Sequence, residues 1–337
     1  MKLERLIAIG GEIRMKILEF DRTRDQTRVL ELLMGEAEVL KRFRDALESD
    51  QASIYIAEDA GTVIGTLFMQ EFDSLSVTPT VFVAPASRRR GIGTELLRFL
   101  DHVLTSSPYE RAERQIDADE GIAAFLEKNG YFRYFVELLM ERDNTPINSI
   151  ATTDAALAER GIVVRNYRDE DYWAYHNIVG VGFYLMRQKA GLMPWYSPPS
   201  AYERKDIAKG SKNRYVMLDR DEIVAVCKIH DNDIALLGVR PDKQSQGYGT
   251  LLLSYWINKI ILERQADKVT IDTTQGNPAK TLYNRMGFRD VGYKYGYVKF
   301  NKPDSRPKAP RGYANEAEIM AAFRLRGSAV DEMGLSS

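Results

Sequence analysis

The chain has almost no cysteine and little histidine. Its 337 residues include one cysteine, Cys227, which excludes an intramolecular disulfide and favours a reducing compartment. Cys227 lies in an apolar run over 223–229, which indicates a buried strand thiol rather than a nucleophile. The three histidines and one cysteine show no ligand spacing such as Cys-x-x-Cys. We therefore predict no metal site.

The chain also lacks an excess of either charge and any long hydrophobic run. Lysine and arginine number 47 and aspartate and glutamate 48, so the net charge is −1, and no basic block stands out beyond Arg88 to Arg90. Nucleic acid is not expected as a partner. No stretch has the length of a membrane span, and the charged N-terminus does not fit a signal peptide. We expect a cytoplasmic protein that does not bind membranes, with enough apolar content for two domains.

A glycine loop that occurs twice is the most informative feature present. Its first copy runs from Val83 to Gly93 and its second from Val239 to Gly249, 156 residues later. Each copy follows a strand-like apolar run and precedes an apolar-periodic, helix-like stretch. The first N–H groups of a helix have no intrahelical partner and the helix dipole is positive there, so an unobstructed loop at that point suits a phosphate. Both loops are therefore predicted to bind a pyrophosphate.

Two common phosphate-binding motifs do not fit these loops. The dinucleotide-binding fingerprint needs a third glycine where Leu96 and Leu252 stand, and neither copy has the Gly-Lys-Ser/Thr of a P-loop. The remaining pattern, Val-x-Pro-x-x-(Gln/Arg)-x-x-Gly-x-Gly, resembles the acetyl-CoA-binding loop of the GNAT N-acetyltransferase superfamily. For one copy alone, a glycine-rich surface turn is the alternative. Two copies with the same flanks make chance repetition much less probable.

A second repeated segment supports this resemblance. Both halves have an apolar helix that runs into a glycine and an aromatic residue, over 120–131 and, 157 residues later, over 277–288. The later copy resembles the GNAT segment in which an asparagine and a tyrosine approach the pantetheine arm and the thioester. Together the matches cover about residues 80–135 and 234–300.

The resemblance implies a fold of two tandem GNAT-like domains. Each is expected to be α/β (α+β), a mixed, mainly antiparallel sheet flanked by helices and splayed at the strand that carries the loop. We expect an N-terminal domain over 15–143, a linker over 144–161, a C-terminal domain over 162–302 and a tail over 303–337. The polar stretch after 143 is the best linker candidate, and a short helix is expected in the tail over 317–325.

The resemblance also assigns catalytic roles in the C-terminal half. Acyl transfer to an amine needs a base for the amine, a donor for the oxyanion and an acid for the leaving thiolate. Tyr283 is the expected acid, the backbone N–H of Val239 the oxyanion donor and Asp272 the candidate base. A packed core aromatic is the alternative for Tyr283, and a strand residue paired with a lysine or hydroxyl is the alternative for Asp272. His176 and His230 are the other possible bases.

Acetyl-CoA is the co-substrate that the resemblance implies. In the C-terminal half the expected binding residues are Val239, Gln244, Ser245, Gln246, Gly247, Tyr248, Gly249, Thr250 and Asn277. In the N-terminal half they are Val83, Arg88, Arg89, Arg90, Gly91, Ile92, Gly93 and Thr94.

The N-terminal half lacks the expected catalytic side chains. At a constant offset Leu126 replaces Tyr283, Glu120 replaces Asn277 and Gln115 replaces Asp272. Leucine cannot donate a proton, so this half is predicted to be catalytically degenerate although its loop is complete.

The acceptor is expected to meet an aromatic-rich segment over 167–202, with three consecutive acids at 169–171. The resemblance implies acetyl transfer from acetyl-CoA, mainly in the C-terminal domain. Because aromatic faces attract ammonium groups, we expect the acceptor to be a primary amine of a small molecule. The alternative for these aromatics is a domain interface. The alternatives for function are a non-catalytic acyl-CoA sensor and a transferase that uses a longer acyl group or a protein amine. The tandem arrangement is compatible with a monomer or a homodimer.

Overall fold

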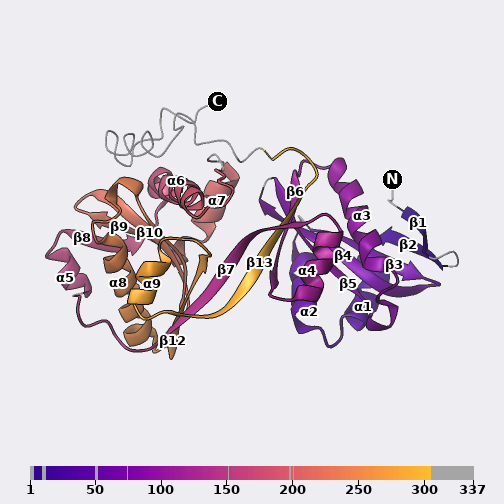
Figure 1. Cartoon of the computed structure of the whole chain (residues 1–337), viewed down its shortest axis with the longest axis horizontal. Coiled ribbons are helices and arrows are strands. Elements are labelled where there is room, and N and C mark those ends of the chain that lie inside the picture. The colour runs from indigo at the N-terminus through magenta and orange to yellow at the C-terminus, as the bar shows by residue number, and fades with distance from the viewer. Residues whose placement is uncertain are drawn as a thin grey trace. The chain divides into compact units, whose positions relative to one another are not determined.

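The computed structural model describes residues 4–9, 13–49, 52–73, 75–150, 152–196, 199 and 201–304. These residues form two compact units (Figure 1). Unit 1 comprises the described residues of Met1–Arg133 together with Gly296–Asp304, and unit 2 those of Tyr134–Tyr295. Of the expected tail, Pro303 and Asp304 are described. The remainder, including the helix expected over 317–325, lies outside the described residues.

Unit 1 has the strand order β1-β2-β3-β4-β5-β6, followed by the end of β13. Neighbouring strands are antiparallel except β5 and β6, which are parallel. The elements are β1 (Glu4–Ile9), β2 (Ile13–Glu19), α1 (Arg22–Leu32), α2 (Ala37–Glu48), β3 (Ser53–Asp59), β4 (Thr62–Asp73), β5 (Ser76–Val83), α3 (Ile92–Thr105), β6 (Arg111–Asp117) and α4 (Glu120–Lys128).

Unit 2 has the strand order β7-β12-β11-β10-β9-β8, with β11 and β12 parallel. β8 begins at Ile162, the expected first residue of the C-terminal domain, and β9 and β10 form a hairpin after it. The elements are β7 (Phe132–Asp143), α5 (Asp154–Ala158), β8 (Ile162–Asn166), α6 (Tyr172–Lys189), α7 (Ala201–Lys209), β9 (Arg214–Asp219), β10 (Glu222–His230), β11 (Asp233–Val239), α8 (Tyr248–Arg264), β12 (Lys268–Thr274), α9 (Lys280–Arg285) and β13 (Arg289–Phe300). Each unit is thus a mixed, mainly antiparallel sheet with flanking helices, as predicted.

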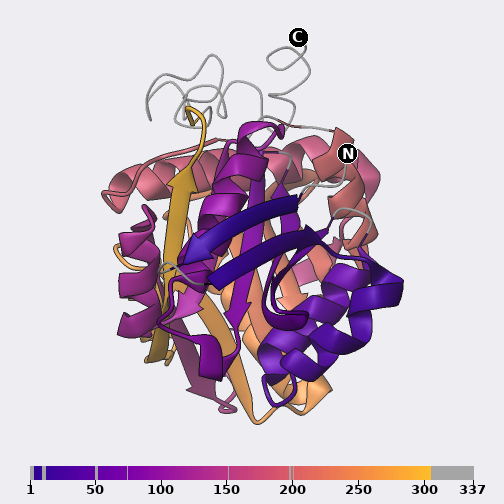
Figure 2. The ribbon, with the colours of Figure 1, turned by 90° about the vertical axis from the view of Figure 1, so that its right-hand side faces the viewer.

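Helices cover both faces of each sheet. In unit 1, α1 and α2 pack on one face through Val29, Leu33 and Phe43, which meet Phe82 of β5 (Figure 2 shows the indigo helices on this side). The apolar side of α3 covers the other face, because residues spaced three and four apart point the same way. In unit 2, α8 covers one face and α6 the other. Cys227 is buried in the core under α8, as expected for a strand thiol.

Each unit is completed by a strand from the other half of the sequence. β7 follows α4 along the chain, but residues 137–143 pair antiparallel with β12 in unit 2. The end of β13 belongs to unit 1, where the Tyr297 hydroxyl donates to the Glu127 carboxylate at 2.8 Å and Lys299 contacts Asp101 at 2.6 Å. β7 and β13 can be followed in Figure 1 as the magenta and yellow strands. The repeat in the sequence does not encode this exchange, and the boundaries it gives for the functional domains remain a prediction.

Candidate active site

The strands that carry the two loops separate from their parallel neighbours almost at once. β11 pairs with β12 only at Asp233↔Thr270 and Ile234↔Ile271. Beyond that point β11 pairs with β10 and β12 with β7, so the two strands diverge. In unit 1, β5 and β6 pair only at Ser76↔Arg111 and Val77↔Ala112. Each unit therefore has the predicted splay, an opening bordered on one side by backbone groups of the loop-bearing strand.

The N–H of Val239 is turned into this opening. The N–H of Arg240 donates to the carbonyl of Val224 on β10 at 2.9 Å. Backbone groups of successive strand residues point to opposite sides, so the N–H and C=O of Val239 point away from β10. Its carbonyl accepts a hydrogen bond from Gln244 Nε2 at 3.2 Å, while its N–H faces the splay.

Unit 1 has the same arrangement. The N–H of Ala84 donates to Ile64 at 2.9 Å, so the N–H of Val83 also faces the opening. Arg88 Nε takes the place of the glutamine amide and donates to the Val83 carbonyl at 3.1 Å. The two loops are therefore closed by the same side-chain-to-backbone contact.

Glycine is required in the loops by conformation. Gly247 has φ +92° and directly precedes α8, and Gly91 has φ +84° and directly precedes α3. A Cβ at Gly247 would meet nothing within 4 Å, so space does not select glycine there. Ser245 and Arg89 also adopt positive φ, of 61° and 63°. Such alternating backbone exposes several N–H groups on one concave surface, which suits an anion.

Arg240 anchors the unit 2 loop and was not singled out by the sequence reasoning. It is 2% exposed and lies 2.7 Å from both the Glu222 and the Asp242 carboxylates. Gln246 Nε2 donates to the Asp242 carbonyl at 2.9 Å, which ties the loop to the same acid. The signal in the sequence is an arginine directly after a strand with an acid two residues later.

In unit 1 the loop is more basic, with Arg88 and Arg89 exposed and Arg90 half-buried. Arg88 lies 3.7 Å from Glu36 and Arg90 lies 3.4 Å from Asp59. The corresponding residues of unit 2, Gln244 to Gln246, carry no charge.

The helix after the splay confirms the alignment of the two halves. A Cβ on Gly249 of α8 would lie 3.6 Å from Leu282 of α9, and one on Gly93 of α3 would lie 3.1 Å from Phe125 of α4. Leu282 and Phe125 are 157 residues apart, as the sequence repeat requires. Tyr283 therefore occupies the position of Leu126 beside the loop-bearing helix.

Tyr283 lies on α9 and is buried in the core beside α8, the helix that follows the unit 2 loop. It is 5% exposed and meets Phe288 edge-on with ring centroids 6.3 Å apart. Burial raises the pKa of Tyr283 to about 12, so the hydroxyl keeps its proton at neutral pH. A proton donor and a packed core aromatic both fit this environment.

Asp272 lies on the opposite side of the sheet from α8. Its neighbours Val269 and Ile271 pack against α8, so alternation turns Asp272 toward the α6 side, where it is exposed. Partial desolvation of the carboxyl and the neighbouring Asp233 raise the pKa of Asp272 above its ordinary value. A raised pKa makes the carboxylate a stronger base than an ordinary aspartate.

Asn277 holds the turn between β12 and α9. Its Nδ2 donates to the Thr273 hydroxyl at 3.0 Å and its Oδ1 accepts from the N–H of Ala279 at 2.9 Å. Both ends of the side chain thus bind the chain itself, and they fix the start of the helix that carries Tyr283.

The two histidines have structural partners. His176 is 2% exposed, with Nδ1 at 2.8 Å from Glu203 and Nε2 at 3.1 Å from the Tyr196 hydroxyl. His230 ends β10, and its Nδ1 lies 3.1 Å from Asn213. Since β10 is antiparallel to β11, His230 is at the far end of β11 from Val239.

The acids at 169–171 do not form a free negative cluster. Each contacts an arginine: Asp171 binds Arg165 through both oxygens, Asp169 pairs with Arg204 at 2.6 Å and Glu170 with Arg168 at 3.4 Å. They lie at the start of α6. Their charge is therefore largely neutralised locally.

The aromatic segment divides into a core part and a part near the splay. Tyr167, Tyr172 and Tyr175 belong to the core between α6 and the sheet. At the other end of α6, the carbonyl of Ala190 lies 3.0 Å from a Cβ built on Gly276, which directly precedes Asn277. The residues that follow α6 therefore start beside the turn that leads to Tyr283.

Asn177 on α6 is a polar residue that the sequence reasoning missed. It is 3% exposed, and its Nδ2 has no hydrogen-bond partner. Ile178 packs on Gly238 of β11 and Tyr175 points toward Arg214 of β9. On a helix of 3.6 residues per turn, Asn177 then projects on the side away from β9, toward the splay.

In unit 1 an arginine of β6 reaches the strand that carries the loop. Thr80 faces the same side as Phe82, which packs on α1 and α2, and Arg114 Nη1 reaches the Thr80 hydroxyl at 3.5 Å. A constant sequence offset aligns Gln115 with Asp272, whereas the strand pairing aligns Glu113 with it, because Val77↔Ala112 and Ile234↔Ile271 are the corresponding pairs.

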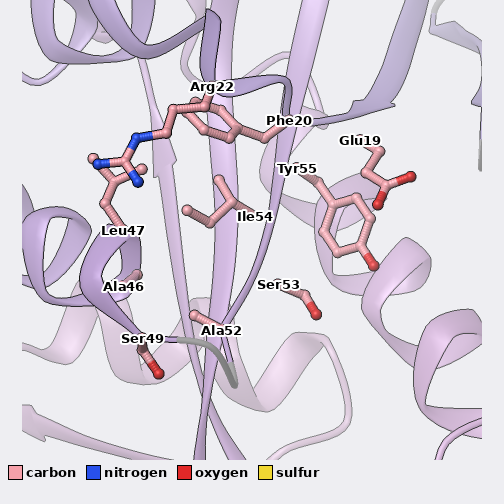
Figure 3. A pocket seen from close by; sticks show the side chains of 10 residues that line it. All are labelled: Glu19, Phe20, Arg22, Ala46, Leu47, Ser49, Ala52, Ser53, Ile54 and Tyr55. Atoms are coloured by element: carbon pink, nitrogen blue, oxygen red, sulfur yellow. The ribbon is translucent and has the colours of Figure 1, made fainter.

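Two pockets lie apart from these residues. One in unit 1, of about 290 Å³, is lined by residues of β2, α1, α2 and β3, with Glu19 beside Tyr55 on one side and Arg22 on the other (Figure 3). One in unit 2, of about 350 Å³, is lined by α5, β8, β9 and α8. Neither contains a residue predicted for the site.

Within the described ranges, no group of three or more histidine, cysteine, aspartate or glutamate side chains is placed to hold a metal ion. None of the helices described here is both long and apolar enough to cross a membrane.

Comparison with known proteins agrees with this geometry. The model of the acetyltransferase (GNAT) domain matches residues 50–132 and 211–290. A mycothiol acetyltransferase of Clavibacter sepedonicus is 28% identical over 233 residues, covering 64% of this chain and 70% of the relative. The [ribosomal protein bS18]-alanine N-acetyltransferase of Haemophilus influenzae is 24% identical over 147 residues, 42% of this chain and 89% of the relative.

Among solved structures, a tandem GNAT protein from the clavulanic acid biosynthesis pathway superposes with a TM-score of 0.57 at 14% identity, covering 87% of this chain and all of that one. The two repeated loops, the two splays and these matches define an acyltransferase fold. The chain belongs to the GNAT superfamily of acetyltransferases, as a tandem member with two GNAT domains.

Proposed function

We propose that unit 2 transfers an acetyl group from acetyl-CoA to the primary amine of a small-molecule acceptor by direct attack on the thioester. The observation that carries this proposal is the N–H of Val239, turned into the splay directly before the loop that leads to α8. A preorganised donor aimed at a developing oxyanion contributes about 10²- to 10³-fold in rate.

The residues would divide the chemistry as follows. The loop from Gln244 to Gly247 and the first turn of α8 hold the pyrophosphate through backbone N–H groups. The amine nitrogen bonds to the carbonyl carbon while Asp272 takes its proton, directly or through a water molecule. Val239 stabilises the oxyanion, and the carbon–sulfur bond breaks as Tyr283 gives its proton to the sulfur.

The acceptor is proposed on two grounds. The exposed Asp272 carboxylate attracts a cationic amine, and Asn177 offers a buried, unpaired amide N–H₂ on the same side of the sheet. An unpaired buried donor is costly, so a ligand with a hydroxyl or carbonyl oxygen would relieve it. The relative that covers more of the chain is named for mycothiol, a small molecule, whereas the relative named for a protein alanine covers less.

One observation favours a second candidate. Tyr283 lies within the hydrophobic core under α8, as a purely structural residue would. An acyl-CoA-binding sensor without turnover would have the same loops and the same buried tyrosine.

Mass-spectrometric detection of acetylated product distinguishes these functions. The intact chain is incubated with acetyl-CoA and a panel of small primary amines, with a peptide that begins with alanine as a further acceptor. We expect product with small amines that also carry hydroxyl or carbonyl groups. Product with the peptide alone would contradict the small-molecule acceptor, and acetyl-CoA binding with no product from any amine would favour the sensor.

A further inference from the structure

Arg114 is a cation in the splay of unit 1 without an ionic partner. Among the described residues it forms no ion pair, and its one hydrogen bond, to the Thr80 hydroxyl, is at the outer limit of hydrogen-bond distance at 3.5 Å. The acids that act on it, Glu38 and Asp117, are beyond ion-pair distance, and Glu38 is bound by Arg42 at 2.8 Å.

The environment of Arg114 penalises its charge. Burial and the neighbouring Arg42 lower the pKa of Arg114 to about 10, although it remains charged at neutral pH. Arg114 is half-buried, and removing a charge partly from water without a partner is costly. An incoming anion would remove this penalty.

The position of Arg114 defines how that anion would arrive. The unit 1 loop is complete, its helix N-terminus and its arginines suit a pyrophosphate, and the Val83 N–H faces the splay. Thr80 precedes Val83 by three residues, roughly 10 Å along the strand. An acetyl group at Val83 is uncharged, whereas a four- or five-carbon diacid chain carries its distal carboxylate along the strand toward Arg114.

We propose that the splay of unit 1 binds the CoA thioester of a dicarboxylic acid, with the distal carboxylate paired to Arg114. This inference rests on the proposed binding of CoA thioesters by the loops. It gives unit 1 a ligand different from that of unit 2, where β12 carries the exposed acid Asp272, which would repel a carboxylate. Guanidinium groups pair with carboxylates through two parallel hydrogen bonds, so the contact is specific as well as strong.

The test is calorimetric titration of the full chain carrying Gly247→Trp, which blocks the unit 2 loop and leaves unit 1. Succinyl-CoA and acetyl-CoA are the probes, with free succinate in the presence of CoA as a third arm. We expect succinyl-CoA to bind at least tenfold more tightly than acetyl-CoA. Adding Arg114→Gln should reduce this ratio to about one. Adding Arg98→Gln, an exposed arginine of α3 paired with Glu95, changes the net charge equally and should leave the ratio intact.

Several results would overturn the proposal. Equal affinity for the two thioesters, or a preference for succinyl-CoA that survives Arg114→Gln, would show that Arg114 does not bind the distal carboxylate. Free succinate that binds as tightly as succinyl-CoA would show that the carboxylate is not delivered on CoA. Binding of neither thioester would also remove the proposed loading of unit 1 with CoA, whereas acetyl-CoA binding without a preference would contradict this inference alone.

Discussion

Replacing Tyr283 with phenylalanine removes one oxygen atom from a buried ring. Tyr283 is 5% exposed, and its ring packs against Phe288. Phenylalanine preserves that packing, so the free energy of unfolding should change by less than about 0.5 kcal/mol. If the hydroxyl protonates the leaving thiolate, turnover should fall by about 10²- to 10⁴-fold, the usual contribution of a general acid. A hundredfold loss corresponds to about 2.7 kcal/mol in the activation free energy.

The pH dependence gives this prediction a second signature. A thiol of the usual pKa, about 8.5, leaves as a stable thiolate at higher pH and then needs no acid. The pKa of Tyr283, raised to about 12 by burial, keeps the wild-type hydroxyl protonated over the same range. The defect of Tyr283→Phe should therefore be largest near pH 7 and should shrink between pH 8.5 and pH 10.

The assay is steady-state release of CoA thiol at saturating acceptor across this pH range. Tyr255→Phe is the matched control, because Tyr255 is also buried but binds Asp154 and Lys259 away from the splay. That variant should lose about 1 kcal/mol of stability and keep its turnover. Unchanged turnover in Tyr283→Phe at pH 7, or a defect independent of pH, would refute the role of Tyr283 as the acid.

The remaining predictions concern the base, a buried acid and the loop helices. Asp272→Asn should lower turnover at least tenfold. In the wild type the acid limb of the pH–rate profile should lie above the ordinary aspartate range, because the pKa of Asp272 is raised. An unchanged profile in the variant would exclude Asp272 as the base. Asp25→Asn should cost about 2–3 kcal/mol at pH 7 by urea unfolding, because Asp25 is fully buried and binds two arginines. Although desolvation opposes it, hydrogen bonding leaves the pKa of Asp25 below its usual value, so this stability is present above the unfolded pKa and is lost as the pH falls through the folded one; a cost independent of pH would contradict this. Gly249→Ala should stabilise α8 by up to about 1 kcal/mol, because a Cβ there makes ordinary contacts. Gly93→Ala should stabilise α3 by less, because its Cβ would lie only 3.1 Å from Phe125. Thermal unfolding compares the two variants, and equal shifts in melting temperature would contradict the packing argument.

The sequence predicted the local elements of the site well. The loops and the helices after them follow from short-range patterns, in which a strand, a glycine and a helix N-terminus occur in fixed order. The splay was expected from the family resemblance that these patterns carry. The equivalence of Leu126 and Tyr283 was predicted from the sequence offset. The structure agrees with it, because Phe125 and Leu282 pack on the matching glycines of the two loop helices.

Long-range pairing was not predictable from these patterns. Periodicity identifies β7 and β13 as strands but does not choose their partners, so the exchange of strands between the two units was missed. The hairpin of β1 with β2 was missed for the same reason. The pairing of β6 with β5 is likewise not given by a constant sequence offset, which aligns Gln115 with Asp272 and gives no signal for the contact of Arg114 with Thr80.

Side-chain partners were the other limit. The acids at 169–171 suggest a negative surface until the arginines that pair with them are seen. The residues next to Asn177 in the sequence do not predict its burial, because a polar residue in a long aromatic helix is usually expected to face solvent. Its burial follows from the packing of Ile178 on Gly238, which depends on the whole sheet.

The most direct test of acetyl transfer in unit 2 is the rate of CoA thiol release from acetyl-CoA by loop variants of the full chain. Gly247→Trp and Gly91→Trp each place a large side chain in one loop at a residue with positive φ, and Gly35→Trp does so in a turn outside both loops. The account predicts that Gly247→Trp abolishes turnover, while Gly91→Trp and Gly35→Trp, verified as folded, retain at least half of it. Turnover that survives Gly247→Trp and is lost in Gly91→Trp would place the chemistry in unit 1 and contradict the account.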